Sequence, residues 1–147
     1  MDDLPQGILF PSESKLKRLW LSPAGLRSYH TDRSAGYNED NRGFGAEYDV
    51  SPIVKLATGA FRNSIDKTSD YLGAALLGTP FSSLPELRAG TLLGAINGYP
   101  DMRHGSWFPM AIPMLSYEGK NFGTNVMALP KIGDISPVIA AQMKFRF

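Results

Sequence analysis

Few side chains in this sequence could carry chemistry. It contains two histidines, His30 and His104, and no cysteine. The absence of cysteine from this sequence excludes thiolate catalysis, disulfides and Cys-ligated zinc. His104 lies in the polar segment 101–105, where we expect a solvated loop residue. The acids between residues 32 and 40 offer oxygen atoms to a cation, but their spacing fits no EF-hand loop. We therefore expect no metal site and no cofactor.

The sequence also gives little support for binding of nucleotides or nucleic acids. Gly43-Phe44-Gly45 is a short glycine motif, but it lacks the third glycine and the βαβ setting of a dinucleotide site. The 15 Lys and Arg residues nearly balance the 14 Asp and Glu residues, for a formal net charge of +1. A dedicated nucleic-acid binder carries a strongly basic face. We expect no nucleotide and no sequence-specific nucleic acid among the partners.

The elements that must position these residues are short strands. With 15 Gly and 11 Pro in 147 residues, the chain is interrupted too often for long helices. Eight runs of strand character are separated by turn residues: 26–30, 43–50, 53–63, 71–77, 87–96, 110–118, 122–129 and 137–147. Their even spacing predicts an all-β protein, an antiparallel meander that closes into a barrel or folds into a sandwich.

The final run alternates most regularly. Ile139, Ala141, Met143, Phe145 and Phe147 fall on one face, and polar side chains fall on the other. In a closed barrel, the apolar face contacts lipid or another subunit while the other face lines the interior. A soluble sheet with one dry face gives the same alternation. These five residues are candidates for an interaction surface, with other protein subunits or an outer membrane as the partner.

The N-terminal part has a different pattern. Within residues 12–21, Leu16, Leu19 and Trp20 recur at helical spacing between basic residues, which predicts a short amphipathic helix. This helix either docks on a partner or seals one end of the core. We expect residues 1–24 to form an arm with this helix and residues 25–147 to form the barrel. The acidic start and the lack of a long apolar run predict no export signal and no membrane helix.

A barrel built from this chain would enclose charges. Glu47 lies in an alternating run, and if it faces the interior it requires a cation, because an unpaired buried carboxylate is costly. Arg62, Lys55 and Arg88 are the candidate partners. We expect these charges to form a structural network inside the barrel.

Several motifs occur in an order that resembles a known family. Tyr37-Asn38-Glu39 within residues 28–39, followed by Gly43-Phe44-Gly45, is similar to a long first loop and second strand, and Phe61-Arg62-Asn63-Ser64 is similar to a Phe-Lys-Asp-Ser motif. The terminal segment 143–147 is similar to a last strand. Together these motifs resemble the lipid A palmitoyltransferases, small outer-membrane barrels of Gram-negative bacteria. The resemblance covers residues 29–147 with gaps and implies an eight-stranded antiparallel up-and-down barrel with an N-terminal amphipathic helix.

The same resemblance implies transfer of an acyl chain to lipid A by a His, an Asp and a Ser near the outer rim. Ser64 takes the serine position, Asn63 replaces the aspartate, and an ungapped alignment puts Ala24 at the histidine. A serine hydroxyl is a poor nucleophile unless a base takes its proton, and neither Asn63 nor Ala24 can do so. His30 lies further along, and a shifted loop would bring it to Ser64. For an enzyme, Ser64, His30 and Asn63 are the catalytic candidates.

Two functions follow. The first is a non-catalytic structural or interaction protein on this barrel, which fits the incomplete catalytic set. The lack of an export signal favours a bacteriophage virion component or a factor delivered to the host envelope. We expect such a protein in the virion, or in the host cytoplasm before assembly. Replacing Ser64 by Ala would then leave the biological activity nearly intact. The alternative is an outer-membrane barrel enzyme that transfers or binds acyl chains of lipid A and whose leader has been removed.

Overall fold

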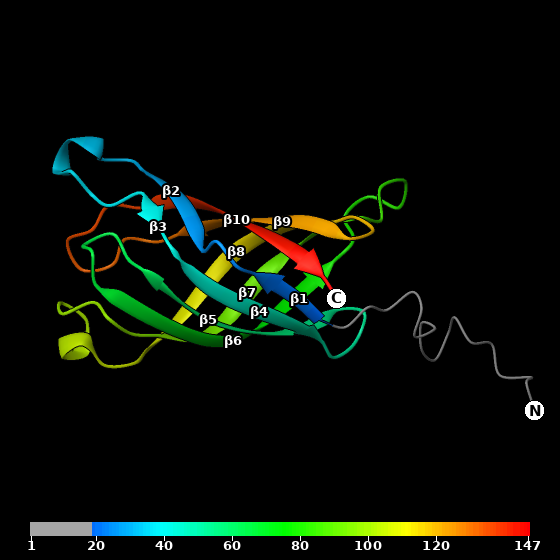
Figure 1. Cartoon of the computed structure of the whole chain (residues 1–147), viewed down its shortest axis with the longest axis horizontal. Helices are drawn as coiled ribbons and strands as arrows, with labels where there is room; N and C mark the ends of the chain where they lie inside the picture. The colour runs from blue at the N-terminus through cyan, green and yellow to red at the C-terminus, as the bar shows by residue number, and fades with distance from the viewer. Residues whose placement is uncertain (1–18) are drawn as a thin grey trace, which may run out of the picture.

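The computed structural model describes residues 19–147, which form a ten-stranded antiparallel sheet (Figure 1). The strands are β1 (Leu19–Ser22), β2 (Leu26–His30), β3 (Asp40–Asn41), β4 (Gly43–Asp49), β5 (Val54–Arg62), β6 (Thr68–Gly78), β7 (Leu87–Ile96), β8 (Phe108–Glu118), β9 (Phe122–Leu129) and β10 (Val138–Arg146). Two short 3₁₀ helices, η1 (Arg33–Ala35) and η2 (Arg103–Gly105), lie in loops. Within residues 19–147, no helix has the length and apolar character needed to cross a membrane.

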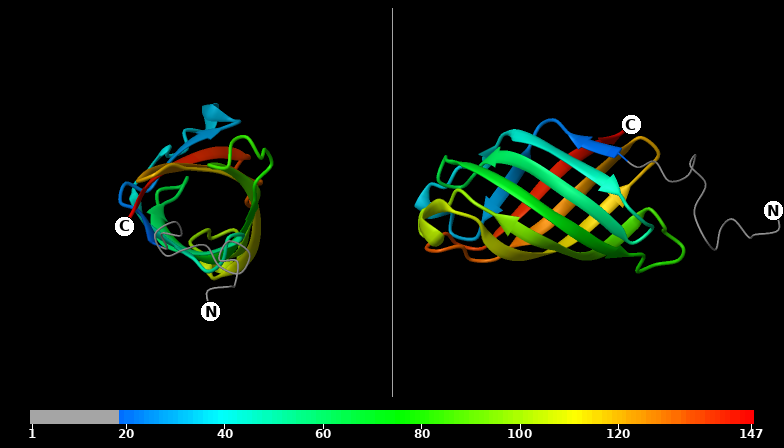
Figure 2. Two further views of the ribbon diagram at one scale, coloured as in Figure 1. Left: turned by 90° about the vertical axis from the view of Figure 1, so that its right-hand side faces the viewer. Right: turned by 90° about the horizontal axis from the view of Figure 1, so that it is seen from below.

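The sheet closes on itself. From β4 to β10, each strand pairs with the next one in the chain, and β10 also pairs with β2 and β1. β1 pairs with β4 and β2 pairs with β3, so β1 and β2 form two halves of one strand, as do β3 and β4. Figure 2 shows the resulting ring of strands end-on. The predicted eight-stranded antiparallel barrel is confirmed, and each of the eight predicted runs contains a strand.

The predicted N-terminal helix is wrong where the structure describes it. Leu19 and Trp20 belong to strand β1, while Leu16 and the rest of 12–18 lie outside the described residues. Residues 19–22 pair with β4 on one side and β10 on the other, and these two ladders override the local helical spacing. The barrel therefore includes residues 19–22, and the boundary expected after residue 24 lies in the turn between β1 and β2.

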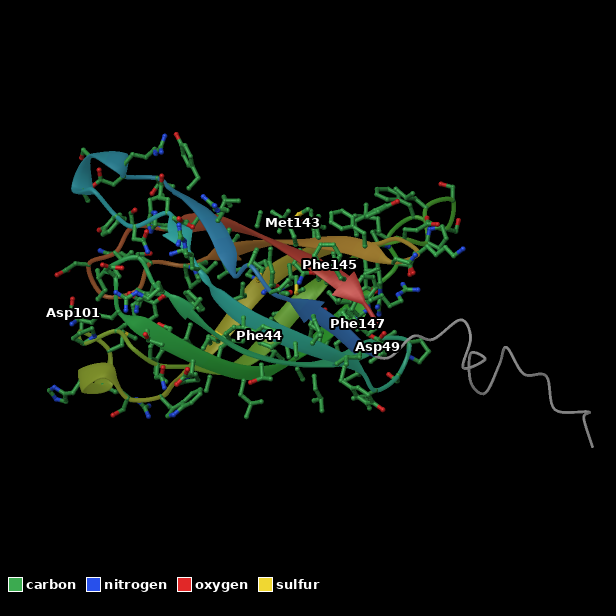
Figure 3. All side chains as sticks on the ribbon, viewed as in Figure 1. Phe44, Asp49, Asp101, Met143, Phe145 and Phe147 are labelled. Atoms are coloured by element: carbon green, nitrogen blue, oxygen red, sulfur yellow. The ribbon has the colours of Figure 1, made fainter. Side chains whose placement is uncertain are left out.

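The outer wall of the barrel is apolar. Among the outward-facing residues of β4 to β10, only Arg62 and Asp70 are charged, where β5 ends and β6 begins. Exposed apolar side chains cover this wall: Phe44, Tyr48, Leu56, Leu72, Leu76, Leu93, Leu115, Tyr117, Phe122, Val126, Ile139, Met143 and Phe145. The five residues predicted to share one face of the last strand are exposed, and Figure 3 labels three of them along β10. An exposed apolar wall of this kind is unusual on a soluble monomer.

Charges collect inside the barrel, at the end that holds the C-terminus. We call this group the ionic cluster; its members are Glu47, Asp49, Lys55, Arg88, Glu118 and Lys144. Lys144 Nζ lies 2.9 Å from Glu47 Oε1 and 2.6 Å from Glu118 Oε2. Lys55 Nζ lies 2.7 Å from the same Glu118 oxygen. Carboxylates and cations are equal in number, so the buried charges compensate one another.

The predicted charge network is confirmed in part. Lys55 approaches Glu47 at 3.7 Å, and Arg88 joins through Glu118 at 3.1 Å. Arg62, the third predicted partner, faces outward, because β5 places it on the side opposite its buried neighbour Phe61. The closest cation to Glu47 is Lys144, which the sequence analysis did not name as a partner.

Trp20 belongs to the barrel interior. Its side chain is fully buried, and its ring faces Lys144 Nζ at 4.8 Å and the Arg146 guanidinium at 4.5 Å. A ring in this position stabilises nearby cations through its negative face. Trp20 is therefore a core residue, not the docking residue that a helix would have presented.

Replacement of Lys144 by Met tests the ionic cluster. Removing one partner leaves buried carboxylates short of a cation, so we expect the free energy of unfolding to fall by about 3–5 kcal/mol. Urea unfolding of the barrel in detergent, followed by tryptophan fluorescence, measures this change. Lys120→Met, in the exposed turn after β8, is the matched control and should change the free energy by less than about 0.5 kcal/mol. Equal effects of both substitutions would contradict a structural role for the cluster.

Candidate functional site

The two ends of the barrel differ. Loops 31–39, 63–67, 97–107 and 130–137 lie at one end, which we call the loop rim. The connections 50–53, 79–86 and 119–121 lie at the other end with the C-terminus. Figure 1 shows the two 3₁₀ turns at the left-hand end and the C-terminus at the right. The residues that could act as nucleophile and base belong to the loop rim.

Ser64, His30 and Glu39 meet at the loop rim. His30 ends β2 and is fully buried, with Nε2 at 2.6 Å from Ser64 Oγ and Nδ1 at 3.3 Å from Glu39 Oε2. The Tyr37 ring packs on the imidazole with a centroid distance of 4.5 Å. With a proton on Nδ1, the imidazole donates to Glu39 and accepts from the serine hydroxyl. This is the order of groups in a serine nucleophile, base and orienting carboxylate.

Glu39 is held as a carboxylate. The backbone N–H of His30 donates to Oε2 at 2.8 Å, and Arg33 Nη2 donates to Oε1 at 2.6 Å. The His30 backbone bond is the main cause, and the Arg33 bond the second, of a pKa for Glu39 lowered to about 2. Glu39 is therefore charged at neutral pH and can stabilise an imidazolium ion.

Main-chain contacts bring the two loops together. Asn38 N donates to Ser64 O at 2.9 Å, which ties loop 31–39 to the turn after β5. One rung below, Arg62 N donates to Arg42 O at 2.8 Å. The serine and the carboxylate thus lie in two adjacent loops, and His30 at the end of β2 contacts both.

Asn63 shapes the turn that carries the serine. Its side chain is fully buried: Oδ1 accepts from the backbone N–H groups of Ile65 and Lys67, and Nδ2 donates to Ser69 Oγ and Gly98 O at 2.9 Å each. All its hydrogen-bonding capacity is used, in three bonds with the backbone and one with the Ser69 side chain. Asn63 is therefore a positioning residue, and it does not substitute for a catalytic aspartate.

The structure brings His30 to Ser64, which is the alternative that the sequence left open. Ala24, which the alignment placed at the histidine position, is exposed in the turn between β1 and β2, whereas His30 contacts Ser64 directly. The carboxylate, Glu39, was missed because it was counted among the turn acids. Its presence in the Tyr37-Asn38-Glu39 motif was the one available signal. His104 is exposed in η2, away from this group of residues.

A hollow lies beside the serine. It has a volume of about 440 Å³ and is lined by Tyr37, Asn38, Ser64, Ile65 and Asp66, with Ala35 and Gly36 at its edge. Backbone and side-chain oxygens share this lining with Ile65 and the Tyr37 ring. The hollow is therefore large enough for a small organic group to approach the Ser64 hydroxyl.

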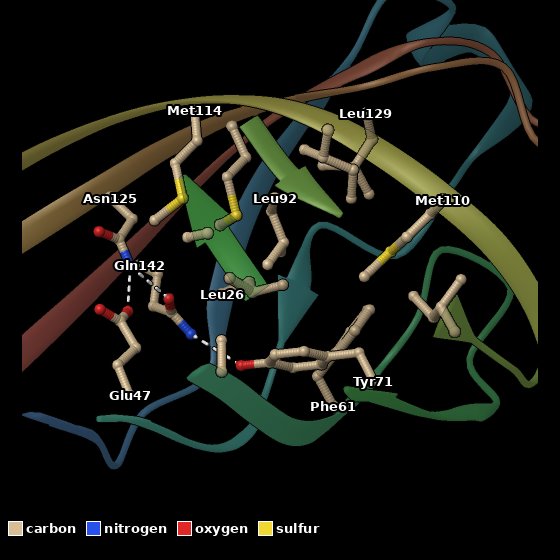
Figure 4. Close-up of a pocket in the computed structure, with 15 residues that line it drawn as sticks. Leu26, Glu47, Phe61, Tyr71, Leu92, Met110, Met114, Asn125, Leu129 and Gln142 are labelled. Atoms are coloured by element: carbon tan, nitrogen blue, oxygen red, sulfur yellow. Dashed lines mark hydrogen bonds between the residues drawn. The ribbon is translucent and has the colours of Figure 1, made fainter. Parts of the chain in front are cut away.

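The interior of the barrel is packed. Its central cavity has a volume of only about 40 Å³ and lies among apolar side chains that include Met110, Met114 and Leu92. Figure 4 shows this pocket with the polar side chains at one side, where Asn125 Nδ2 donates to Glu47 Oε2 at 2.6 Å. A space of this size holds a few water molecules. The larger space is at the rim.

Solved structures share this fold. The de novo designed TMB2.3 superposes with a TM-score of 0.63 at 17% identity, over 89% of this chain and 94% of that one. The N-terminal β-barrel domain of Pseudomonas aeruginosa OprF gives 0.50 at 18% identity, over 89% and 98%. Ail, the attachment invasion locus protein of Yersinia pestis, gives 0.41 at 14% identity, over 88% and 97%. No protein-family model and no curated protein sequence matches the chain.

The likenesses to TMB2.3 and to the OprF domain establish the fold and no activity. The chain has the fold of a small membrane β-barrel, which supports the resemblance to the palmitoyltransferases at the level of architecture. The expected location in a virion or in host cytoplasm finds no support in these neighbours, which fit the outer-membrane alternative.

Asn63→Asp tests the role assigned to Asn63. A carboxylate there places an acceptor against the Gly98 carbonyl and loses a donor, so we expect the free energy of unfolding to fall by about 1–3 kcal/mol. Chemical denaturation measures it, with Asn121→Asp in the exposed turn after β8 as the matched control. A catalytic acid at this position would instead leave stability unchanged and raise the reactivity of Ser64.

Proposed function

We propose that this protein is an outer-membrane β-barrel with the loop rim on the outside of the cell. The apolar outer wall supports this location, because lipid is the solvent that such a wall requires. Strands of nine to eleven residues, as in β5 to β8 and β10, suit the thickness of a bilayer when tilted. In known barrels of this type, the longer loops are extracellular and the turns at the other end are short.

We further propose that the loop rim cleaves or transfers acyl esters of membrane lipids. The observation that carries this proposal is the 2.6 Å contact between His30 Nε2 and Ser64 Oγ, with Glu39 on the other ring nitrogen. Placed at the rim, the serine lies at the level of lipid headgroups and ester groups. The resemblance to the lipid A palmitoyltransferases points to the same chemistry.

The reaction has two halves. Ser64 Oγ attacks the ester carbonyl carbon while its proton moves to His30 Nε2, and Glu39 stabilises the imidazolium. The tetrahedral intermediate then breaks its bond to the leaving alcohol, which takes the proton from His30. An acyl group remains on Ser64. Water or the hydroxyl of a second lipid gives its proton to His30 and attacks the acyl carbon, which releases a fatty acid or a new ester and restores the serine.

The acyl chain has its place outside the barrel. A central cavity of about 40 Å³ is too small for a fatty acyl chain, whereas the hollow of about 440 Å³ beside Ser64 is open to the surroundings. We therefore infer that the ester enters the hollow at the rim while its chain stays in the membrane.

Ser64→Ala tests the chemistry. We expect the rate of cleavage of a soluble p-nitrophenyl ester by the barrel in detergent to fall by a factor of about 10³ or more, because the nucleophile is lost. His30→Gln should cause a comparable loss, and Glu39→Gln a smaller one. A fluorophosphonate probe should label Ser64 in the wild-type protein, as read by peptide mass spectrometry.

Ser106→Ala is the matched control, because Ser106 is an exposed serine in another loop of the same rim. It should change neither the rate nor the labelling. Wild-type protein that is folded yet neither labelled nor active would overturn the proposed chemistry and return the protein to a non-catalytic function.

Met143→Arg tests the location. Met143 faces outward on β10, away from both ends of the barrel (Figure 3). A cation on the lipid face near the middle of the bilayer costs about 2–4 kcal/mol, so we expect less folded barrel in the outer-membrane fraction. Asp101→Arg, at the loop rim, introduces the same residue outside the membrane and should be tolerated. Normal membrane fractionation of Met143→Arg would argue against a lipid-facing wall.

A further inference from the structure

Three arginines lie side by side on the outer wall at the loop rim. Arg27 is in β2, Arg42 lies between β3 and β4, and Arg62 ends β5. Their side chains are 75%, 82% and 49% exposed. Each follows a buried residue that faces the interior, namely Leu26, Asn41 and Phe61. The strand period of two therefore directs all three arginines outward.

The ladder places these arginines on neighbouring strands. Arg27 is opposite Asp40 in the β2–β3 pair, and Arg62 N donates to Arg42 O at 2.8 Å. Asp40 lies between the first two, at 3.5 Å from Arg27 Nε and 3.2 Å from Arg42 Nε. We call Arg27, Arg42 and Arg62 the arginine row.

The arginine row contains more cationic groups than its carboxylate partners neutralise. One carboxylate, Asp40, is shared by two guanidinium groups, and both contacts use Nε, so the terminal amino groups of these side chains are available to other oxygens. Arg62 has its own partner, Asp66, at 3.1 Å. The five side chains together carry a net positive charge. A planar guanidinium fits a phosphate with two parallel hydrogen bonds.

On β4 and β5, the row marks the level at which the apolar wall ends, whereas on β2 and β10 the exposed Tyr29 and Ile139 lie beyond Arg27 toward the rim. Phe44 follows Arg42 by two residues on the same outward face and is 53% exposed, and it pairs with Ala60, two residues before Arg62. Below this level, the outward faces of β4 and β5 carry no charge. In a membrane, cations at such a boundary meet the phosphate groups of lipids.

We propose that the arginine row binds the phosphate of an anionic lipid in the leaflet at the loop rim, and so anchors that lipid against the outer wall of β2 to β5. This inference rests on the membrane location proposed above and is independent of the chemistry at Ser64. The lipid phosphate bridges the terminal amino groups of Arg27 and Arg42, while Asp40 keeps the two side chains in place.

Lipid binding to the detergent-solubilised full chain tests this inference. Native mass spectrometry measures the binding of phosphatidic acid, with diacylglycerol of the same acyl chains as the phosphate-free probe. We expect the wild-type protein to bind phosphatidic acid and not diacylglycerol. In the variant R27Q/R42Q/R62Q, binding of phosphatidic acid should be weaker by about tenfold or more, the loss of a bidentate charged contact or two. Arg103→Gln, an exposed arginine elsewhere on the same rim, should leave it unchanged.

Each other result has a defined meaning. Unchanged binding by the triple variant, or an equal loss with Arg103→Gln, overturns the inference, since the charge would then act without a specific site. Competition by inorganic phosphate at the same concentration as the lipid also overturns it, in favour of a free-anion site. Flotation of the wild-type protein with liposomes is measured separately: failure to insert removes the proposed location, whereas insertion with unchanged binding removes only the arginine row. Esterase activity on a soluble ester should be the same in the double variant R27Q/R42Q and the wild type, because neither side chain lines the hollow beside Ser64.

Discussion

Closure of the sheet is the constraint on which the rest of this structure depends. β10 pairs with β9 on one edge and with β1 and β2 on the other, which closes the ring; the two-residue strand β3 pairs with β2 alone. A closed sheet satisfies its backbone N–H and C=O groups internally, which permits an outer wall made of apolar side chains. Since side chains alternate along a strand, the same closure forces every second residue into the interior, whatever its charge.

The side chains that fill the interior differ from one end of the barrel to the other. Near the C-terminus, Lys55 and Lys144 are fully buried and share Glu118, so their burial is compensated by short contacts of opposite charge. The middle is filled with methionine and leucine side chains around a small cavity. At the loop rim, the buried polar side chains of His30 and Asn63 form hydrogen bonds with loop residues. The buried charges at one end of the barrel thus neutralise one another, and the other end holds the contact between His30 and Ser64.

The candidate site follows from the way the strand ends meet at the loop rim. His30 is the last residue of β2, Ser64 lies two residues after β5, and Glu39 lies one residue before β3, so each is at or next to a strand end. The bond between Asn38 and Ser64 joins the two loops. The arginine row sits on the same strands, on the outer side. Because side chains alternate along a strand, the His30 imidazole faces the interior at this rim, and the guanidinium groups of the arginine row face outward.

The sequence by itself predicted eight of the ten strands and an antiparallel meander, because alternation and turn residues act over a few neighbours. It predicted the two faces of β10 and the need for Lys55 near Glu47. It failed at Leu19 and Trp20, where pairing with β4 and β10 outweighs helical spacing. Only the tertiary structure decided that His30 contacts Ser64, since the end of β2 and the turn after β5 come together only in the closed barrel. An alignment without gaps compares residues by their position along the chain. The contact between His30 and Ser64 joins residues that are far apart along the chain and close in space.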